Sequence, residues 1–88
     1  MKQEEKINAL RDAIEEANTK ETYGLYILNN TIVEQKDLDT IKEALDLLEA
    51  GFNLNNFSLT AGQKKLFKAY KIDIEKGKAI NIENLEAV

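Results

Sequence analysis

The sequence contains no cysteine, histidine, tryptophan or proline. Without cysteine there is no disulfide framework, no thiolate nucleophile and no zinc-finger spacing. Without histidine the chain lacks the usual general base at neutral pH and the commonest metal ligand. These absences exclude most enzyme classes, and we expect a protein that is not an enzyme and that holds neither a metal nor a cofactor.

The few remaining candidates for catalysis are isolated from one another. Ser58 is the only serine, and no histidine is present to activate it. The four glycines are scattered along the chain and form no phosphate-binding loop. Asp37 and Asp39 are two residues apart, a spacing that points their carboxylates in different directions on a helix. We therefore expect the function to lie in binding surfaces.

Long hydrophobic runs are also missing from these 88 residues. The densest apolar stretch, from Tyr23 to Leu28, is far shorter than the roughly 20 residues that a membrane-spanning helix requires. The N-terminal residues are polar and charged, without the apolar segment of a signal peptide. With no linker and no internal repeat, the sequence predicts a single domain over residues 1–88 that acts in the cytoplasm and not at a membrane.

Apolar residues at three- and four-residue spacing predict two amphipathic helices in the first half of the chain. One covers about residues 3–18. The other covers about residues 37–50, with Asp37 as its N-cap and Gly51 in the left-handed position that ends a helix. Their apolar seams are Ile7, Leu10, Ile14 and Ala17, and Leu38, Ile41, Leu45 and Leu48.

Between these helices, the aromatic and β-branched residues 22–34 predict a β-hairpin. Residues 29 and 30 are both asparagine, which tolerates positive φ and suits a two-residue turn that places Ile27 opposite Ile32. Both faces are then largely apolar: Leu25, Ile27 and Ile32 on one, Tyr26, Leu28 and Val33 on the other. One face can cover the helices, and the other favours an interface.

A third helix follows an asparagine-rich loop. Thr60 and Gln63 match the capping-box pattern, in which each side chain accepts a hydrogen bond from the other residue's backbone. The helix covers about residues 60–72, or it continues to residue 76 with Gly77 as its cap.

The C-terminal segment has Ile80 and Ile82 at strand spacing and Leu85 and Val88 at helical spacing, which predicts a short additional strand or a final turn. Taken together, a helix, a hairpin and two further helices predict a small α+β domain.

Charge is divided unevenly along the chain. Residues 1–50 hold six basic and twelve acidic residues, whereas residues 51–88 hold six basic and four acidic ones. One hairpin face and the acidic side of the second helix form the first candidate surface for a protein partner. Its residues are Tyr23, Tyr26, Leu28, Val33, Asp39, Glu43, Asp46 and Glu49.

The lysines of the third helix form a second candidate surface, which consists of Lys64, Lys65, Lys68 and Lys71. Interleaved aromatic residues resemble a nucleic-acid site, but Phe67 and Tyr70 share a side with Leu66 and so belong to the core. The net charge of −4 also argues against nucleic acid. We expect these lysines to lie against the acidic helices, within the monomer or across a homodimer.

The composition is rich in lysine, asparagine and isoleucine, and the chain contains a single arginine. In size and composition it resembles the small accessory proteins of phages and mobile elements in low-GC bacteria. That resemblance implies a protein-binding inhibitor or modulator of a bacterial host protein, acting by occlusion, with anti-defence among its roles. Three alternatives stay open: a homo-oligomeric assembly protein, an acidic mimic of DNA whose carboxylates align on one surface, and a small-ligand sensor with an enclosed apolar pocket between hairpin and helices.

Overall fold

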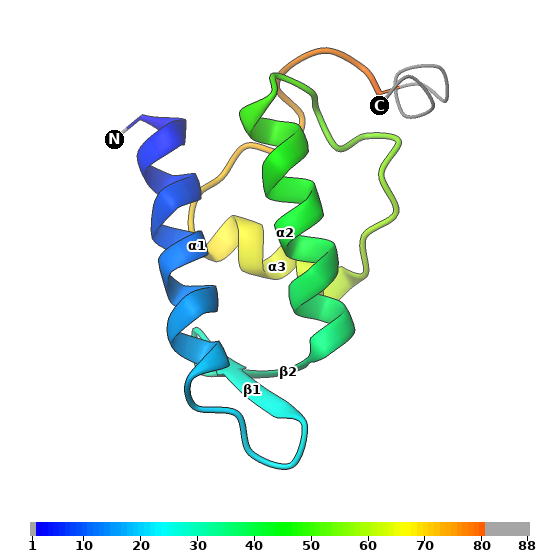
Figure 1. The fold of residues 1–88 in the computed structure, drawn as a ribbon. Helices are drawn as coiled ribbons and strands as arrows, with labels where there is room; N and C mark the ends of the chain where they lie inside the picture. The colour runs from blue at the N-terminus through cyan, green and yellow to red at the C-terminus, as the bar shows by residue number, and fades with distance from the viewer. Residues whose placement is uncertain (1, 81–88) are drawn as a thin grey trace.

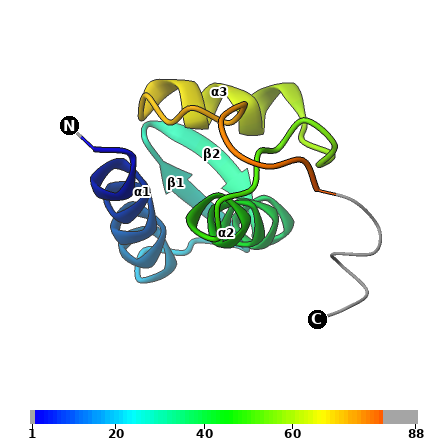
Figure 2. The ribbon, with the colours of Figure 1, turned by 90° about the horizontal axis from the view of Figure 1, so that it is seen from above.

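The computed structural model describes residues 2–80. Its elements are α1 (Gln3–Asn18), β1 (Leu25–Leu28), β2 (Thr31–Glu34), α2 (Gln35–Glu49) and α3 (Ala61–Ala69). The predicted α+β fold is thus confirmed. α1 and α2 stand side by side, α3 crosses behind them, and the hairpin closes one end (Figures 1 and 2).

The core lies between the three helices and one face of the hairpin. α1 and α2 bury their predicted apolar seams, and α3 adds Leu66 and Phe67. Burying a large apolar side chain stabilises a fold by about 1.5–3 kcal/mol, so this shared cluster holds the elements together. Its members are Ile7, Leu10, Ile14, Leu28, Val33, Leu38, Ile41, Ala44, Leu45, Leu48, Leu54, Leu66, Phe67, Ile72 and Ile80.

The hairpin has the predicted register. Ile27 pairs with Ile32, and the strands are joined by Asn29 and Asn30. Both asparagines have left-handed φ angles, of 51° and 62°. Two such residues in succession characterise a type I′ turn, whose twist matches that of the flanking strands. The turn chemistry therefore fixes which residues face each other across the hairpin.

α2 begins two residues before the predicted start. Glu34 is its N-cap, with extended backbone, and Asp37 lies in the first turn as the third helical residue. The Glu34 N–H donates to Asp37 Oδ2 (3.0 Å). The prediction of Asp37 as N-cap is wrong because its carboxylate accepts a hydrogen bond from an amide that precedes the helix, the second half of a capping box.

The C-terminal ends of α2 and α3 have the same geometry. Gly51 has φ +95°, and the Phe52 N–H donates to the Leu47 carbonyl (3.0 Å), which confirms the predicted cap. After α3 the left-handed residue is Lys71, with φ +58°, and the Ile72 N–H donates across it to the Phe67 carbonyl (2.9 Å). Of the two predicted ends for the third helix, the earlier one is correct.

Gly77 is therefore not a helix cap. It has φ +118°, and a Cβ at this position would lie 2.5 Å from the Gly51 carbonyl oxygen. The Lys78 N–H donates to that same oxygen (2.8 Å). A glycine is required here because two backbone segments approach too closely for any side chain.

The last described residues, 72–80, pack along the loop that follows α2. Phe52 and Lys78 form a single parallel bridge, and Ile80 is buried. No regular strand is formed after α3 within residues 2–80. Ile82, the second residue of the predicted C-terminal strand, and the predicted final turn lie outside the described residues.

Candidate functional site

The hairpin turns one face to the core. Leu28 and Val33 are only 1% and 5% exposed, and Tyr26 is half-buried, with its hydroxyl donating to Gln35 Oε1 (2.6 Å). The expectation that Leu28 and Val33 contact a partner is wrong, because both belong to the core. β2 runs into α2 with no intervening loop, and this connection folds the helix over that face.

The opposite face, which we call the outer face, consists of Leu25, Ile27 and Ile32. These side chains are 43%, 66% and 68% exposed. Ile27 and Ile32 are directly opposite each other in the register, so they form one continuous apolar patch with Leu25. No helix of the described chain covers this patch. The structure thus confirms two apolar faces and corrects which of them is available for binding.

Tyr23 lies at the tip of a second tight turn and is 97% exposed. Its φ is +53° and that of Gly24 is +76°. The turn is closed by reciprocal hydrogen bonds between the backbones of Thr22 and Leu25 (both 3.0 Å), and Glu21 Oε1 accepts from the Gly24 N–H (2.6 Å). A left-handed conformation costs a residue with a Cβ about 1–2 kcal/mol. A bulky aromatic is therefore held in a strained position where it contributes almost nothing to the core.

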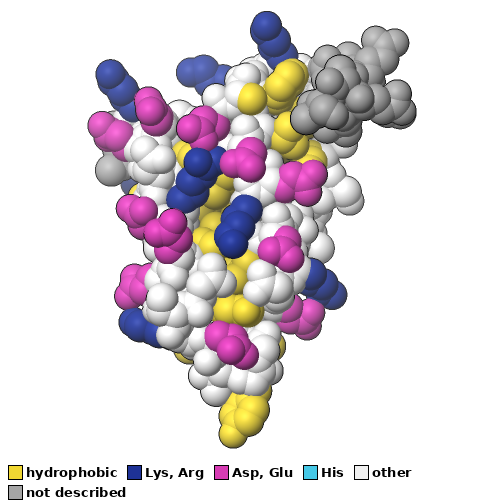
Figure 3. Space-filling model, viewed as in Figure 1, with side chains coloured by type: hydrophobic (Ala, Val, Ile, Leu, Met, Phe, Trp, Pro, Cys, Tyr) yellow, Lys and Arg dark blue, Asp and Glu magenta, His cyan; other side chains and the backbone are white. Residues whose placement is uncertain are grey.

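The acidic residues of α1 and α2 gather on one face of the molecule. Figure 3 shows carboxylates over both helices, with basic side chains and a strip of apolar ones between them. Arg11 Nη2 lies 2.6 Å from Asp46 Oδ1 and 2.7 Å from Glu49 Oε2. Asp39 accepts a hydrogen bond from Gln35 Nε2 (2.9 Å). Of the four acidic candidates on α2, Asp46 and Glu49 share this one cation, and Asp39 and Glu43 remain exposed without one among residues 2–80.

The lysines of α3 are exposed and lie apart from the acidic helices. Within residues 2–80, none of Lys64, Lys65, Lys68 and Lys71 comes within 4.0 Å of a carboxylate. The expectation that they pair with acidic residues of the same chain is therefore wrong for the described residues. Pairing across a homodimer stays a prediction.

A buried polar contact that no sequence pattern indicates ties α3 to the start of α2. Gln63 is 6% exposed. Its Oε1 accepts from the Thr60 N–H (2.9 Å) as the predicted capping box requires, while its Nε2 donates to Asp37 Oδ1 (2.9 Å). The capping boxes of two helices are thus joined by one hydrogen bond between residues that are 26 positions apart. This link joins α3 to the first turn of α2, directly after β2.

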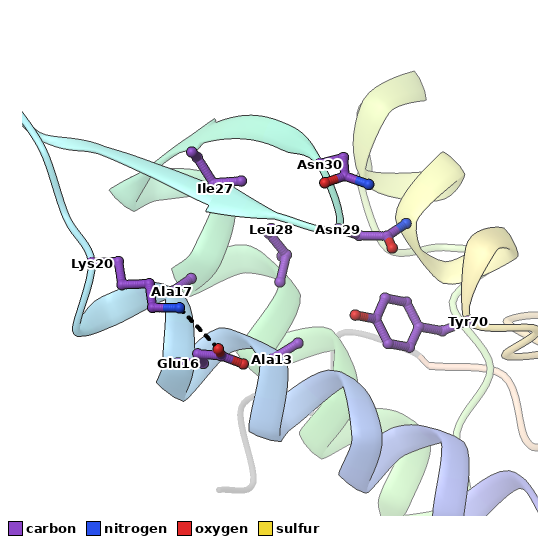
Figure 4. Close-up of a pocket in the computed structure, with 9 residues that line it drawn as sticks. All are labelled: Ala13, Glu16, Ala17, Lys20, Ile27, Leu28, Asn29, Asn30 and Tyr70. Atoms are coloured by element: carbon purple, nitrogen blue, oxygen red, sulfur yellow. Dashed lines mark hydrogen bonds and ion pairs between the residues drawn. The ribbon is translucent and has the colours of Figure 1, made fainter.

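Grooves run along both edges of the hairpin. On the β1 side, a depression of about 450 Å³ separates the strand from α1, and Tyr70 points into it from α3 (Figure 4). On the β2 side, adjoining hollows of about 210 Å³ and 430 Å³ separate Thr31 and its neighbours from α3. Gly62 and Leu66 line both hollows, and Lys65 lines the larger one.

Metal chemistry and membrane insertion find no support in the described part of the chain. No group of three or more acidic side chains within residues 2–80 is arranged to hold a metal ion. None of the helices there is long and apolar enough to cross a bilayer. Comparison with protein-family models, with curated proteins and with solved structures finds no match to this chain.

Proposed function

We propose that this protein is a non-enzymatic module that binds another protein through the outer face of its hairpin. The observation that carries the proposal is the contrast between two similar apolar faces, one in the core and one uncovered. A cross-strand pair of isoleucines that is about two-thirds exposed adds little to the packing of this chain. Contiguous apolar patches of this kind mark interaction sites.

Tyr23 extends this surface and supports the same proposal. Tyrosine is enriched at the centres of protein interfaces because it buries a large amphipathic area while losing little conformational entropy. Strained residues that are held in place by their surroundings concentrate at functional sites. The exposed ring of Tyr23, presented by a turn whose backbone is closed by hydrogen bonds, is suited to fill a pocket on a partner.

The composition supports a narrower proposal about the partner and the source. The protein is encoded by a phage or mobile element and inhibits or redirects a bacterial host protein in the cytoplasm, an anti-defence role included. Because the surface is flat and carries no catalytic side chains, the mechanism is occlusion of the partner's own working surface. The acidic faces of α1 and α2 steer encounters with a basic partner.

The direct test is site-specific photo-crosslinking in cells of a low-GC bacterium. The crosslinker p-benzoyl-phenylalanine, itself aromatic, replaces Tyr23 in one protein and the exposed Lys76, which lines neither groove of the hairpin, in a control. We expect a discrete adduct with one host protein from position 23 only. Adding Ile27→Ser and Ile32→Ser should abolish that adduct while leaving the far-ultraviolet circular dichroism unchanged. The same adducts from both positions, or none from position 23, would refute the proposal.

A homodimer through the same outer face is the first alternative. The Ile27–Ile32 pair is close to self-complementary and can meet its own copy across a two-fold axis. Light scattering after size exclusion at micromolar concentration distinguishes a homodimer from a monomer whose outer face is free for a host protein. A dimer that the double serine variant makes monomeric would favour self-association, and a monomer would exclude it.

A DNA mimic is the second alternative, favoured by the gathering of carboxylates on one face (Figure 3). The pairing of Arg11 with Asp46 and Glu49 weakens that negative field. The variant Asp39→Lys/Glu43→Lys reverses the two acidic candidates of α2 that have no such cation among residues 2–80. If the crosslinked partner still binds this variant, and if binding changes little with salt, charge mimicry is excluded.

A further inference from the structure

The outer edge of β2 carries backbone groups that the hairpin does not use. In an antiparallel pair closed by a two-residue turn, the residues flanking the turn exchange hydrogen bonds and the next pair does not. Leu28 and Thr31 flank the turn, so Ile27 and Ile32 are the pair without mutual hydrogen bonds. The Ile32 N–H and carbonyl therefore point outward, and no backbone hydrogen bond joins them to another segment within residues 2–80.

The corresponding edge of β1 is partly closed. Leu25 is already paired with Thr22, whose backbone folds back along that strand. An ion pair between Lys20 and Glu16 (3.1 Å) lies at the rim of the groove against α1, and the ring of Tyr70 points into the same space (Figure 4). Of the two edges, the one on β2 has the room for a further strand.

The wall opposite the β2 edge is formed by α3 and leaves space beside the strand. Thr31 and Ile32 line the groove on the strand side, while Gly62 and Leu66 line it on the helix side. A Cβ on Gly62 would meet nothing closer than Thr60 Oγ1 at 4.0 Å. The absence of a side chain at Gly62 keeps this part of the groove open, and it is not required by the packing of the chain itself.

One acidic and one basic side chain line this groove, in different hollows. Lys65 lines it and has no carboxylate partner among residues 2–80. Asp37 also lines it, but Asp37 Oδ1 accepts from Gln63 and Oδ2 accepts from the Glu34 N–H. An extended chain lying here would thus meet unpaired backbone groups on one side and an unpaired ammonium group on the other.

We propose that the β2–α3 groove takes an extended acidic segment of the protein partner, which adds to β2 as a third strand. Backbone hydrogen bonds to Ile32 supply affinity, and Lys65 selects for Asp or Glu in the segment. The proposal rests on the proposed function, because it names the chemistry of the partner that the outer face meets. Ile32 belongs to both surfaces, so a partner seated on the outer face reaches this edge directly.

The test begins with selection of binders from a displayed library of random decapeptides on the immobilised protein. The counter-target in this selection is the variant Gly62→Leu, whose added side chain fills the groove. Position 62 is exposed and helical, and leucine favours helix more than glycine does, so this variant should keep or raise the melting temperature. We expect enriched peptides rich in Asp and Glu that do not bind Gly62→Leu. Failure to enrich any peptide, or enrichment of peptides without acidic residues, would overturn the proposal.

The matched charge variants are Lys65→Glu and Lys64→Glu, which change the net charge equally but differ in place on α3. The strongest enriched peptide should bind Lys65→Glu about tenfold more weakly and Lys64→Glu as tightly as the unmodified protein. Amide hydrogen exchange at Ile32 should slow when the peptide binds. Equal weakening in both variants, or an unprotected Ile32 amide, would contradict strand addition.

The crosslinking experiment separates this proposal from the proposed function. If Gly62→Leu leaves the adduct at position 23 intact while the double serine variant removes it, the outer face binds the partner and the groove does not. If neither variant changes that adduct, both proposals fail. A dimer whose Ile32 amide is protected without any peptide would assign the edge to a second copy and overturn the peptide proposal.

Discussion

The two faces of the hairpin carry similar residues and have opposite environments. Leu28 and Val33 are in the core, whereas Ile27 and Ile32, each adjacent along the same strands, are largely exposed. Alternation of side chains along a strand guarantees two faces but does not say which is buried. The connection from β2 into α2 decides it here, and the hydrogen bond from Tyr26 to Gln35 is available only on that side.

Alanine substitutions on the two faces should give the largest measurable contrast. Leu28→Ala removes a buried side chain and leaves a cavity, so it should lower the free energy of unfolding by about 3 kcal/mol. Ile27→Ala removes a side chain that is 66% exposed, and it should lower that free energy by less than about 1 kcal/mol. Urea unfolding followed by circular dichroism measures both.

Equal losses of unfolding free energy for Leu28→Ala and Ile27→Ala would contradict the difference in burial between the two faces. They would mean that the outer face is buried in solution, as in a homodimer, and the midpoint of urea unfolding would then rise with protein concentration. If the midpoint of urea unfolding is independent of protein concentration and Ile27→Ala loses little unfolding free energy, the outer face is exposed in solution.

The second prediction concerns the contact that joins α3 to the first turn of α2. Gln63→Glu keeps the acceptor for the Thr60 N–H but puts a carboxylate against Asp37 in place of the donor Nε2. The free energy of unfolding should fall by about 2 kcal/mol, because a buried hydrogen bond becomes a repulsion between like charges.

A compensating variant tests whether this loss comes from the contact itself. In Gln63→Glu/Asp37→Asn, the amide at position 37 donates to the new carboxylate and still accepts from the Glu34 N–H. Urea unfolding should show that the double variant recovers most of this loss, because the contact again pairs one carboxylate with one amide. A double variant no more stable than Gln63→Glu would show that another contact positions α3.

Local signals in the sequence were sufficient for much of this fold. The turn at Asn29 and Asn30, the capping box of Thr60 with Gln63 and the cap at Gly51 each depend on residues within a few positions of one another. Steric and hydrogen-bonding rules that act over one turn of chain therefore predicted the order of elements and the hairpin register.

The features that sequence reasoning missed depend on distant residues or on a choice between equivalent options. The hydrogen bond from Gln63 to Asp37 joins two motifs that are each complete without it. Lys71, after α3, adopts a conformation that glycine favours, so nothing at this position distinguishes the earlier predicted end of the helix from the later one. For the candidate site, patterning identified two apolar faces but not the exposed one, because both satisfy the same alternation.

The smallest effect we predict compares two strained residues, one on the proposed binding surface and one away from it. Tyr23 and Lys71 both have left-handed φ, and neither has glycine's freedom to adopt it. Tyr23→Gly and Lys71→Gly should each raise the free energy of unfolding by about 0.5–1 kcal/mol, because relief of strain exceeds the entropy that glycine adds to the unfolded chain. Binding should separate them: the host protein identified by crosslinking should be captured by Lys71→Gly and lost by Tyr23→Gly. If Tyr23→Gly is stabilised and still captures that protein, the strain at the turn has no role in recognition and the outer face binds through its aliphatic residues alone.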